Sequence, residues 1–287
     1  MEATKKYELS NITIEFNGVT LHRIKALKDF SNVKAGDLGG WVEKENNLSQ
    51  IGDAWIGGDA KVCDNAKAFG NAQIYGNAQI CGKAQVFGNA QICGNVIVFD
   101  DAIIYDNAKV YGNAHICNNA KVFGNAMVYD NAFVYGDAWV YGNAKVFGNA
   151  KVDGNAEVYG NAWVFGKSKV YGNAEVYGNA KVYGNAQVYD NAEIYGKSMV
   201  YGDAQVYGRA RISGDASVRC GADYIIFKNF WSSGRFFTWT RSNNMWSVGC
   251  FYGTGEELIR KAYKDSEKSG KEYEKIVRYV DSILADK

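Results

Sequence analysis

The chain contains two histidines, His22 and His115, and histidine is the side chain that most readily exchanges a proton near neutral pH. A general base also needs a partner that orients its ring and a pocket that holds the substrate. His115 stands where neighbouring repeats carry lysine or glutamine. We therefore interpret it as a surface residue and predict no catalytic residue.

Two further patterns resemble ligand sites. Glu157, Glu175 and Glu193 recur at one constant spacing, so they could form a carboxylate column that holds a cation, although solvated carboxylates are the favoured interpretation. Gly166-Lys167-Ser168 resembles the end of a phosphate-binding loop. Its spacing from Gly160 is one residue too long and no helix follows, so we interpret it as a turn.

The six cysteines contain no CxxC pair. Cys63 and Cys81 are separated by the same interval as the glutamates, which predicts stacked neighbours on one face. Metal ligation by this column is the alternative to reduced thiols, and reduced thiols are favoured. The sequence predicts no metal and no cofactor.

Aromatic and basic residues alternate near the C-terminus. Such a pattern binds a nucleotide or single-stranded nucleic acid by stacking and charge, or it fills the core of a small sheet, which is the favoured interpretation. The loop from 231 to 235 is the best candidate for exposure. The predicted binding residues are Trp231, Arg235, Trp239 and Arg241.

A six-residue repeat positions most of these side chains. The phrase Gly-Asn-Ala-x-Val-Tyr recurs from Ala54 to Ala222 without an insertion or deletion, in 28 copies. Because strand side chains alternate, alanine and valine point inward while x and the aromatic residue point outward. The opposite phase would bury Lys61, Lys109 and Glu157, which is too costly. Short repeats in register predict a parallel β-solenoid whose coils bury their apolar side by stacking.

Each repeat turns at its Gly-Asn pair, because glycine adopts backbone angles forbidden to other residues and asparagine tolerates the left-handed region. The aromatic residues should stack in outward ladders along the rod. Stabilisation of the rod is favoured over a ligand platform as the role of these ladders.

Position x becomes apolar in the middle of the rod. The resulting apolar patch predicts a self-association surface, because exposed patches of this kind usually mark interfaces. We expect a homo-oligomer. The predicted interface residues are Ile97, Phe99, His115, Cys117, Phe133 and Tyr135.

Both ends of the rod should be capped, since a bare solenoid end exposes unpaired strand edges. The sequence predicts a β cap over 1–50, the repeat rod over 51–222 and an α+β domain over 223–287. The cap contains a hairpin of strands 7–16 and 19–27 around Asn17-Gly18. The last domain has three strands, at about 224–229, 235–241 and 245–251, followed by two helices, the first opened by a capping box of Thr254 and Glu257.

The repeat resembles the hexapeptide unit of left-handed parallel β-helix proteins. This resemblance implies a triangular left-handed coil of three repeats and about nine coils for this chain. Many proteins of that family are acyltransferases, which implies a catalytic histidine at a cleft between trimer subunits, often beside a loop extruded from the coil. No extruded loop interrupts residues 54–222.

The flanking motifs, such as Ala-Gly-Asp-Leu-Gly-Gly-Trp-Val near the start and Gly-Cys-Phe-Tyr-Gly-Thr near the end, resemble hexapeptide-repeat proteins of bacteriophages and prophages. This resemblance implies a non-enzymatic binding or scaffold protein whose C-terminal module contacts a host or phage protein. A counter-defence protein that sequesters a nucleotide or blocks a host enzyme is the second hypothesis, and acyl transfer is the third.

The net charge and the apolar patterning of the chain exclude some classes of binding partner. The formal net charge is +1, which argues against electrostatic capture of DNA and against an acidic DNA mimic. No apolar run has the length of a membrane span, and the first residues lack the apolar segment of a signal peptide. We therefore expect a cytoplasmic protein with no membrane partner, in the bacterial host if it is phage-encoded.

Overall fold

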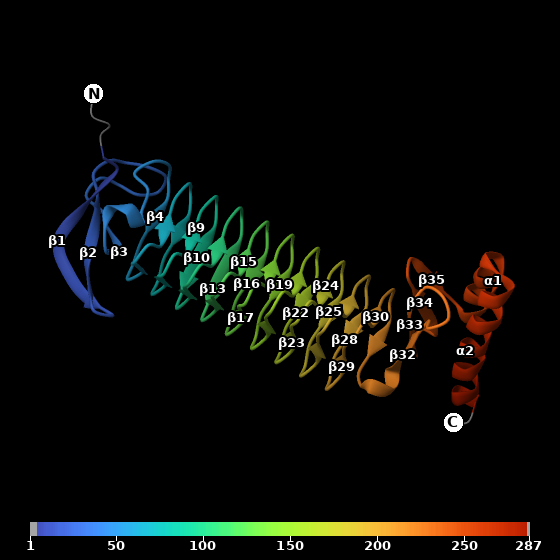
Figure 1. Ribbon diagram of the computed structural model, residues 1–287. Coiled ribbons are helices and arrows are strands. Elements are labelled where there is room, and N and C mark those ends of the chain that lie inside the picture. Colours follow the sequence, from blue (N-terminus) through green and yellow to red (C-terminus); the bar gives the residue numbers. More distant parts are fainter. Residues whose placement is uncertain (1–4, 286–287) are drawn as a thin grey trace.

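The computed structural model describes residues 5–285, which form a long β-solenoid with a small cap at each end (Figure 1). The predicted mainly β fold with a hairpin before the rod and an α+β module after it is confirmed. The outermost residues of the predicted terminal domains, 1–4 and 286–287, lie outside the described range.

The N-terminal cap is built on the predicted hairpin. Strands β1 (Tyr7–Phe16) and β2 (Val19–Ala26) pair antiparallel, and both turn residues, Asn17 and Gly18, have positive φ. Strand β3 (Leu38–Val42) pairs antiparallel with β2 and parallel with β5 (Lys61–Val62). The cap therefore continues directly into one sheet of the rod, with a short 3-10 helix over Glu45–Asn47 after β3.

The rod consists of 28 short strands, β4 to β31, in three parallel sheets. Besides β5, the first sheet holds β8 (Gln79–Ile80), β11 (Ile97–Val98), β14 (His115–Ile116), β17 (Phe133–Val134), β20 (Lys151–Val152), β23 (Lys169–Val170), β26 (Gln187–Val188) and β29 (Gln205–Val206). The second holds β4 (Trp55–Ile56), β7 (Gln73–Ile74), β10 (Gln91–Gly94), β13 (Lys109–Gly112), β16 (Met127–Val128), β19 (Lys145–Val146), β22 (Trp163–Val164), β25 (Lys181–Val182), β28 (Met199–Val200) and β31 (Ser217–Val218). The third holds β6 (Lys67–Ala68), β9 (Gln85–Val86), β12 (Ile103–Ile104), β15 (Lys121–Val122), β18 (Trp139–Val140), β21 (Glu157–Val158), β24 (Glu175–Val176), β27 (Glu193–Ile194) and β30 (Arg211–Ile212).

The alanine and aliphatic columns form the core of the rod, as the repeat predicts. Ala138 and Val140 are fully buried, and the same columns are buried along the whole rod. Partners in neighbouring strands of a sheet are three repeats apart, as in the pairing of Trp139 with Glu157. Each coil therefore places equivalent side chains directly above one another, and the predicted inward phase is confirmed.

The corners differ from the prediction in one respect. The residue with left-handed φ is the glycine, such as Gly160 at +66°, or an aspartate in its place, such as Asp130 at +58°. The asparagine that follows has another role, because its side-chain amide donates to the asparagine one coil further on, as from Asn143 to Asn161 at 3.1 Å. Asparagine is selected here for a hydrogen-bonded ladder rather than for its backbone conformation.

Outward aromatic residues stack along the rod at one-coil spacing. Ring centroids in these ladders are 4.7 to 5.3 Å apart and the ring planes lie within 13° of parallel. Offset stacking of this kind stabilises neighbouring coils without a partner. The structural interpretation of the ladders is supported by this geometry.

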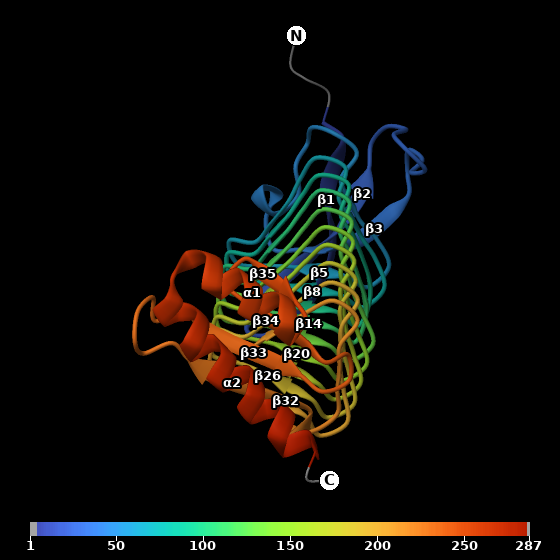
Figure 2. The same ribbon diagram turned by 90° about the vertical axis from the view of Figure 1, so that its right-hand side faces the viewer.

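The C-terminal module places a small sheet between the last coil and two helices (Figure 1). Four antiparallel strands form the sheet, one more than predicted: β32 (Tyr224–Lys228), β33 (Phe236–Thr240), β34 (Met245–Val248) and β35 (Phe251–Gly253), after a 3-10 turn over Gly221–Asp223. Helix α1 (Gly255–Asp265) begins at the predicted Thr254 capping box, and α2 (Glu267–Ala285) packs Val277 and Val280 into the module's core. Seen along the rod in Figure 2, the module lies across the end of the stacked coils.

Hydroxyl groups of the module satisfy exposed backbone donors of the last coil. The backbone N–H of Arg211 donates to Thr238 Oγ1 at 2.9 Å, and that of Ser217 donates to Ser242 Oγ at 2.7 Å. These contacts block the strand edges that a bare solenoid end would leave unpaired.

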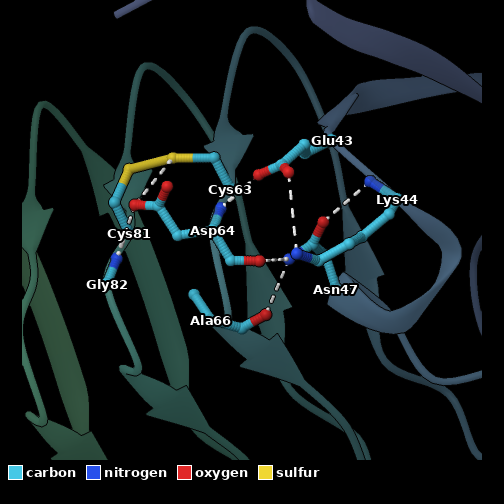
Figure 3. Close-up of a disulfide and its surroundings, with 8 residues drawn as sticks. All are labelled: Glu43, Lys44, Asn47, Cys63, Asp64, Ala66, Cys81 and Gly82. Atoms are coloured by element: carbon cyan, nitrogen blue, oxygen red, sulfur yellow. Dashed lines mark hydrogen bonds and ion pairs between the residues drawn. A yellow bond between two sulfur atoms is a disulfide. The ribbon is translucent and has the colours of Figure 1, made fainter. Parts of the chain in front are cut away.

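A disulfide joins Cys63 and Cys81 on the first two coils of one face (Figure 3). Their Cα atoms are 4.9 Å apart, so the expectation of reduced thiols is wrong for this pair. The corner that follows Cys63 is also fixed by side chains of the cap, since Asp64 N donates to Glu43 and Asn47 Nδ2 donates to the carbonyl of Ala66. The first coil is therefore tied both to the cap and to the next coil.

Candidate functional site

The candidate site lies on the outer surface of the first sheet, in the middle of the rod. Strands β11, β14, β17 and β20 stack there in register, so that Ile97, His115, Phe133 and Lys151 form one column. The neighbouring column holds Phe99, Cys117, Tyr135 and Asp153. We call these eight residues the histidine face.

Strand β14 fixes His115 on this surface because Ile116, the next residue, is fully buried in the core. The imidazole lies against Phe133 with ring centroids 4.6 Å apart. Desolvation by these neighbours lowers the pKa of His115 below its usual 6.5. The ring is therefore neutral near pH 7 and able to accept a proton.

The aromatic ladder of this sheet is interrupted twice on the histidine face. Cys117 separates Phe99 from Tyr135, and Asp153 separates Tyr135 from Tyr171. The repeat predicts an aromatic residue at both positions, so Asp153 could have been singled out from the sequence as the carboxylate that breaks the ladder. A polar side chain and open space replace a stacked ring there.

A cavity of about 200 Å³ occupies the gap that Asp153 leaves. It begins at Tyr135, one strand from His115, and extends to Tyr171 with Lys151 and Lys169 in its wall. Lys151 Nζ also lies 5.4 Å from the Phe133 ring centroid, and Phe133 separates it from His115 in the column. The first sheet thus carries a neutral base and, one strand away, a small cavity lined by two lysines and a carboxylate.

Cys117 is a poor nucleophile in this setting. Burial, together with the carboxylates of Asp100 and Asp153, raises the pKa of its thiol to about 11. The residue is a protonated thiol at neutral pH, and the thiolate is the form that attacks an acyl group. Covalent catalysis through Cys117 is therefore disfavoured.

The structure brings together all six residues that the sequence predicts as an interface. They lie on three successive strands of one sheet and are partly or largely exposed, Phe99 being 36% exposed. Their contact with a second copy stays a prediction. The six are Ile97, Phe99, His115, Cys117, Phe133 and Tyr135.

The predicted C-terminal binding residues do not form a stacking surface. Trp239 is 1% exposed and its indole N–H donates to Asn244, while Trp231 packs on Phe237 and Tyr273. These tryptophans fill the module's core, which is the interpretation the sequence favoured. Arg241 is partly buried, and Arg235 is exposed at the edge of a different cleft.

The glutamate column is paired with tyrosines rather than merely solvated. The hydroxyl of Tyr141 donates to Glu157 at 2.8 Å, and that of Tyr159 donates to Glu175 at 2.9 Å. Burial and the adjacent carboxylates raise the pKa of both tyrosines. These contacts explain the column as part of the rod, without a cation.

Among residues 5–285, one cluster of side chains with metal-ligand chemistry lies at the disulfide. The sulfurs of Cys63 and Cys81 and a carboxylate oxygen of Asp64 lie within 4.8 Å of one another. Both sulfurs belong to the disulfide, and Asp64 accepts the backbone N–H of Gly82 at 2.9 Å, so the structure explains all three residues without a metal (Figure 3). Neither helix among residues 5–285 combines the length and the apolar composition of a membrane-spanning segment.

Comparison with known proteins points to a solenoid of the same repeat type. Residues 90–106, 126–142 and 204–219 match the model of the YdcK β-solenoid repeat. A protein of Escherichia coli (strain K12) named "uncharacterized acetyltransferase YdcK" is 38% identical to the chain over 60 residues. That stretch covers 18% of the chain and 18% of the relative.

These findings overturn the functional prediction made from the sequence. The named relative is described as an acetyltransferase, and neither comparison supports a non-enzymatic phage-type scaffold. The prediction failed because it took the function from flanking motifs and from a surface position of His115, whereas the matched segments lie in the repeats themselves. The chain is similar in its repeats to the YdcK β-solenoid.

Proposed function

We propose that the chain transfers an acetyl group from a thioester to a nucleophilic acceptor at the histidine face. The observation that carries this proposal is the neutral imidazole of His115 on strand β14, one strand away from a cavity that Tyr135, Asp153 and two lysines line. The name of the YdcK relative supports the reaction class.

His115 acts as the general base in this proposal. Its imidazole takes the proton of the acceptor amine or hydroxyl as the acceptor attacks the thioester carbonyl, and the imidazolium returns that proton to the departing thiolate. The acetyl carbon thus gains one bond to the acceptor and loses its bond to sulfur. Because Cys117 stays protonated, transfer is direct and needs no acetyl-cysteine.

Lys151 and Lys169 have the charge to hold an anionic donor or acceptor at the cavity.

The histidine face is also our proposed homo-oligomer interface, and a second copy would cover the cavity and exclude water from the reaction. In light scattering we expect an Ile97→Glu, Phe133→Glu double variant to have the monomer mass and wild type a multiple of it. Phe230→Glu, which changes a phenylalanine that is 85% exposed on the module, should keep the wild-type mass. A wild-type protein with the monomer mass would contradict the proposed homo-oligomer interface.

The pH dependence of the reaction tests the proposal. With acetyl-coenzyme A and a panel of amines, we expect wild type to release free thiol, with an acid limb that lies below pH 6.5. The sign follows from the lowered pKa of His115: the ring stays neutral below its usual pKa and is protonated only at more acid pH. Absence of thiol release above the buffer rate across the panel would refute acetyl transfer.

We also retain two finer predictions as proposals. Cytoplasmic location is supported by the free thiols of Cys93, Cys117, Cys220 and Cys250, which outnumber the single disulfide pair. Phage or prophage origin rests on the flanking motifs alone.

A further inference from the structure

We propose that a cleft between the end of the rod and the C-terminal module binds the diphosphate group of a small ligand. The cleft has a volume of about 390 Å³, within the range of small-molecule sites. One wall comes from the last coils, with Asn191, Arg209 and Arg211, and the other from the module, with Arg235 and Phe236. We call it the junction cleft.

The arginines of the junction cleft carry more positive charge than the protein neutralises. Arg211 forms an ion pair with Glu193 at 2.9 Å and also donates to the carbonyl of Gly249. Arg209 and Arg235 are exposed, and neither has a carboxylate within 4.0 Å among residues 5–285. Two guanidinium groups therefore remain for an anion from solution.

Contacts within the two walls fix the positions of these arginines in the cleft. Phe236 lies under Arg209, with the guanidinium carbon 5.4 Å from the ring centroid. Arg235, the residue before it, runs along Gly249, whose ideal Cβ would lie 3.6 Å from Arg235 Cδ. Arg211 reaches the carbonyl of the same glycine. The positions are thus set by contacts between the rod and the module, not by free surface side chains.

The asparagine ladder adds a further donor. Asn191 accepts from Asn173, but the next corner along the rod carries Arg209 where the three preceding coils carry asparagine. Among residues 5–285, no acceptor receives a hydrogen bond from the side-chain NH2 group of Asn191. Its N–H groups are therefore available to a ligand beside the arginines. At this corner a cationic arginine, Arg209, stands at the opening of the cleft in place of an asparagine that would accept a hydrogen bond from Asn191.

Donors in this arrangement select phosphate. Guanidinium groups bind phosphate oxygens bidentately, and two unneutralised arginines match the charge of a diphosphate better than that of a single carboxylate. The cleft lies on strands β27 and β30 of the third sheet, whereas the histidine face lies on the first sheet. It is therefore a second site, separate from the proposed acetyl transfer.

Titration calorimetry of the full chain with inorganic pyrophosphate tests this inference without any activity measurement. We expect saturable binding at one site per chain, weakened at least about tenfold in an Arg209→Gln, Arg235→Gln variant, because charge-assisted hydrogen bonds are lost. Uridine diphosphate forms a second arm. Tighter binding of this ester than of pyrophosphate identifies an esterified ligand, and the reverse identifies a free one.

Arg260→Gln is the matched control, since Arg260 is exposed on α1 and away from the cleft. Its affinity should stay within about twofold of wild type, the change that general surface charge produces. Failure of wild type to bind either diphosphate, or equal weakening by Arg260→Gln, would overturn the inference. If the double variant unfolds, Arg235→Gln alone gives the same test, with an expected weakening of about tenfold.

Discussion

Replacing His115 with glutamine is expected to lower the rate of acetyl transfer by about a hundredfold to ten-thousandfold, the usual contribution of a general base. Glutamine keeps a polar side chain of similar size but cannot accept a proton at neutral pH. The fold should be unaffected because His115 is only half-buried and Ile116, not His115, contributes to the core. The rate of thiol release from acetyl-coenzyme A gives the measurement.

His22→Gln provides a matched control, because the chain has two histidines and the same substitution can be made at each. His22 lies in the capping hairpin, with Nδ1 3.3 Å from the carbonyl of Ser10. It is on β2, far along the chain from the histidine face. This variant should keep the wild-type rate. A His115→Gln variant with the wild-type rate would contradict the assignment of the base, while loss of activity in both variants would place the effect elsewhere.

Replacing Val110 with aspartate is expected to destabilise the rod by at least about 4 kcal/mol, among the largest effects of a single substitution. Val110 lies in β13, is fully buried, and stacks between Ile92 and Val128. An aspartate there would be an unpaired charge in an apolar column, with no donor among its neighbours. Thermal unfolding followed by circular dichroism measures the loss.

Lys109→Asp is the control for this variant. Lys109 is the preceding residue and is exposed on the outer face of the same strand, so the identical new side chain reaches water. Its effect on stability should stay within about 0.5 kcal/mol. Equal destabilisation by the two variants would show that the alternation of inward and outward residues is not what holds the rod together.

The rod was predictable because the sequence signals that specify it act between neighbouring residues and recur in every repeat. Alternation in a short strand decides which side chains point inward, and the cost of burying Lys109 decides between the two phases. The hairpin and the Thr254 helix cap were predictable for the same reason, since their signals lie close together in the sequence. A pattern repeated 28 times leaves little room for error in register.

Features that depend on contacts across the chain were not predictable in this way. The short strand β35 forms because it pairs with β34, and the junction cleft needs Arg209 and Arg235 to meet from two separate units. Spacing placed Cys63 and Cys81 one above the other but led to the wrong prediction of reduced thiols, and the contact between the first two coils brings the two sulfurs together. Asp153 was visible in the sequence as a break in the aromatic column, but its cavity depends on the rings on either side.

Function was the weakest prediction because the same scaffold supports binding and catalysis. From the sequence, His115 was interpreted as one replacement in a polar column, and its role as a base is our proposal. The structure adds the desolvation that lowers the pKa of this ring and the lysine-lined cavity one strand away. Neither property is contained in the spacing of the repeat.

The constant register of the coils also bears on how such a chain changes in length. Because every coil meets its neighbours through the same alanine, aliphatic and asparagine columns, excision of one whole coil rejoins matching surfaces. Unequal recombination between near-identical stretches of the gene therefore shortens or lengthens the rod by whole coils and preserves the register in which the coils stack. The distance between the two ends is the quantity that such events alter, while both caps and their chemistry are inherited intact.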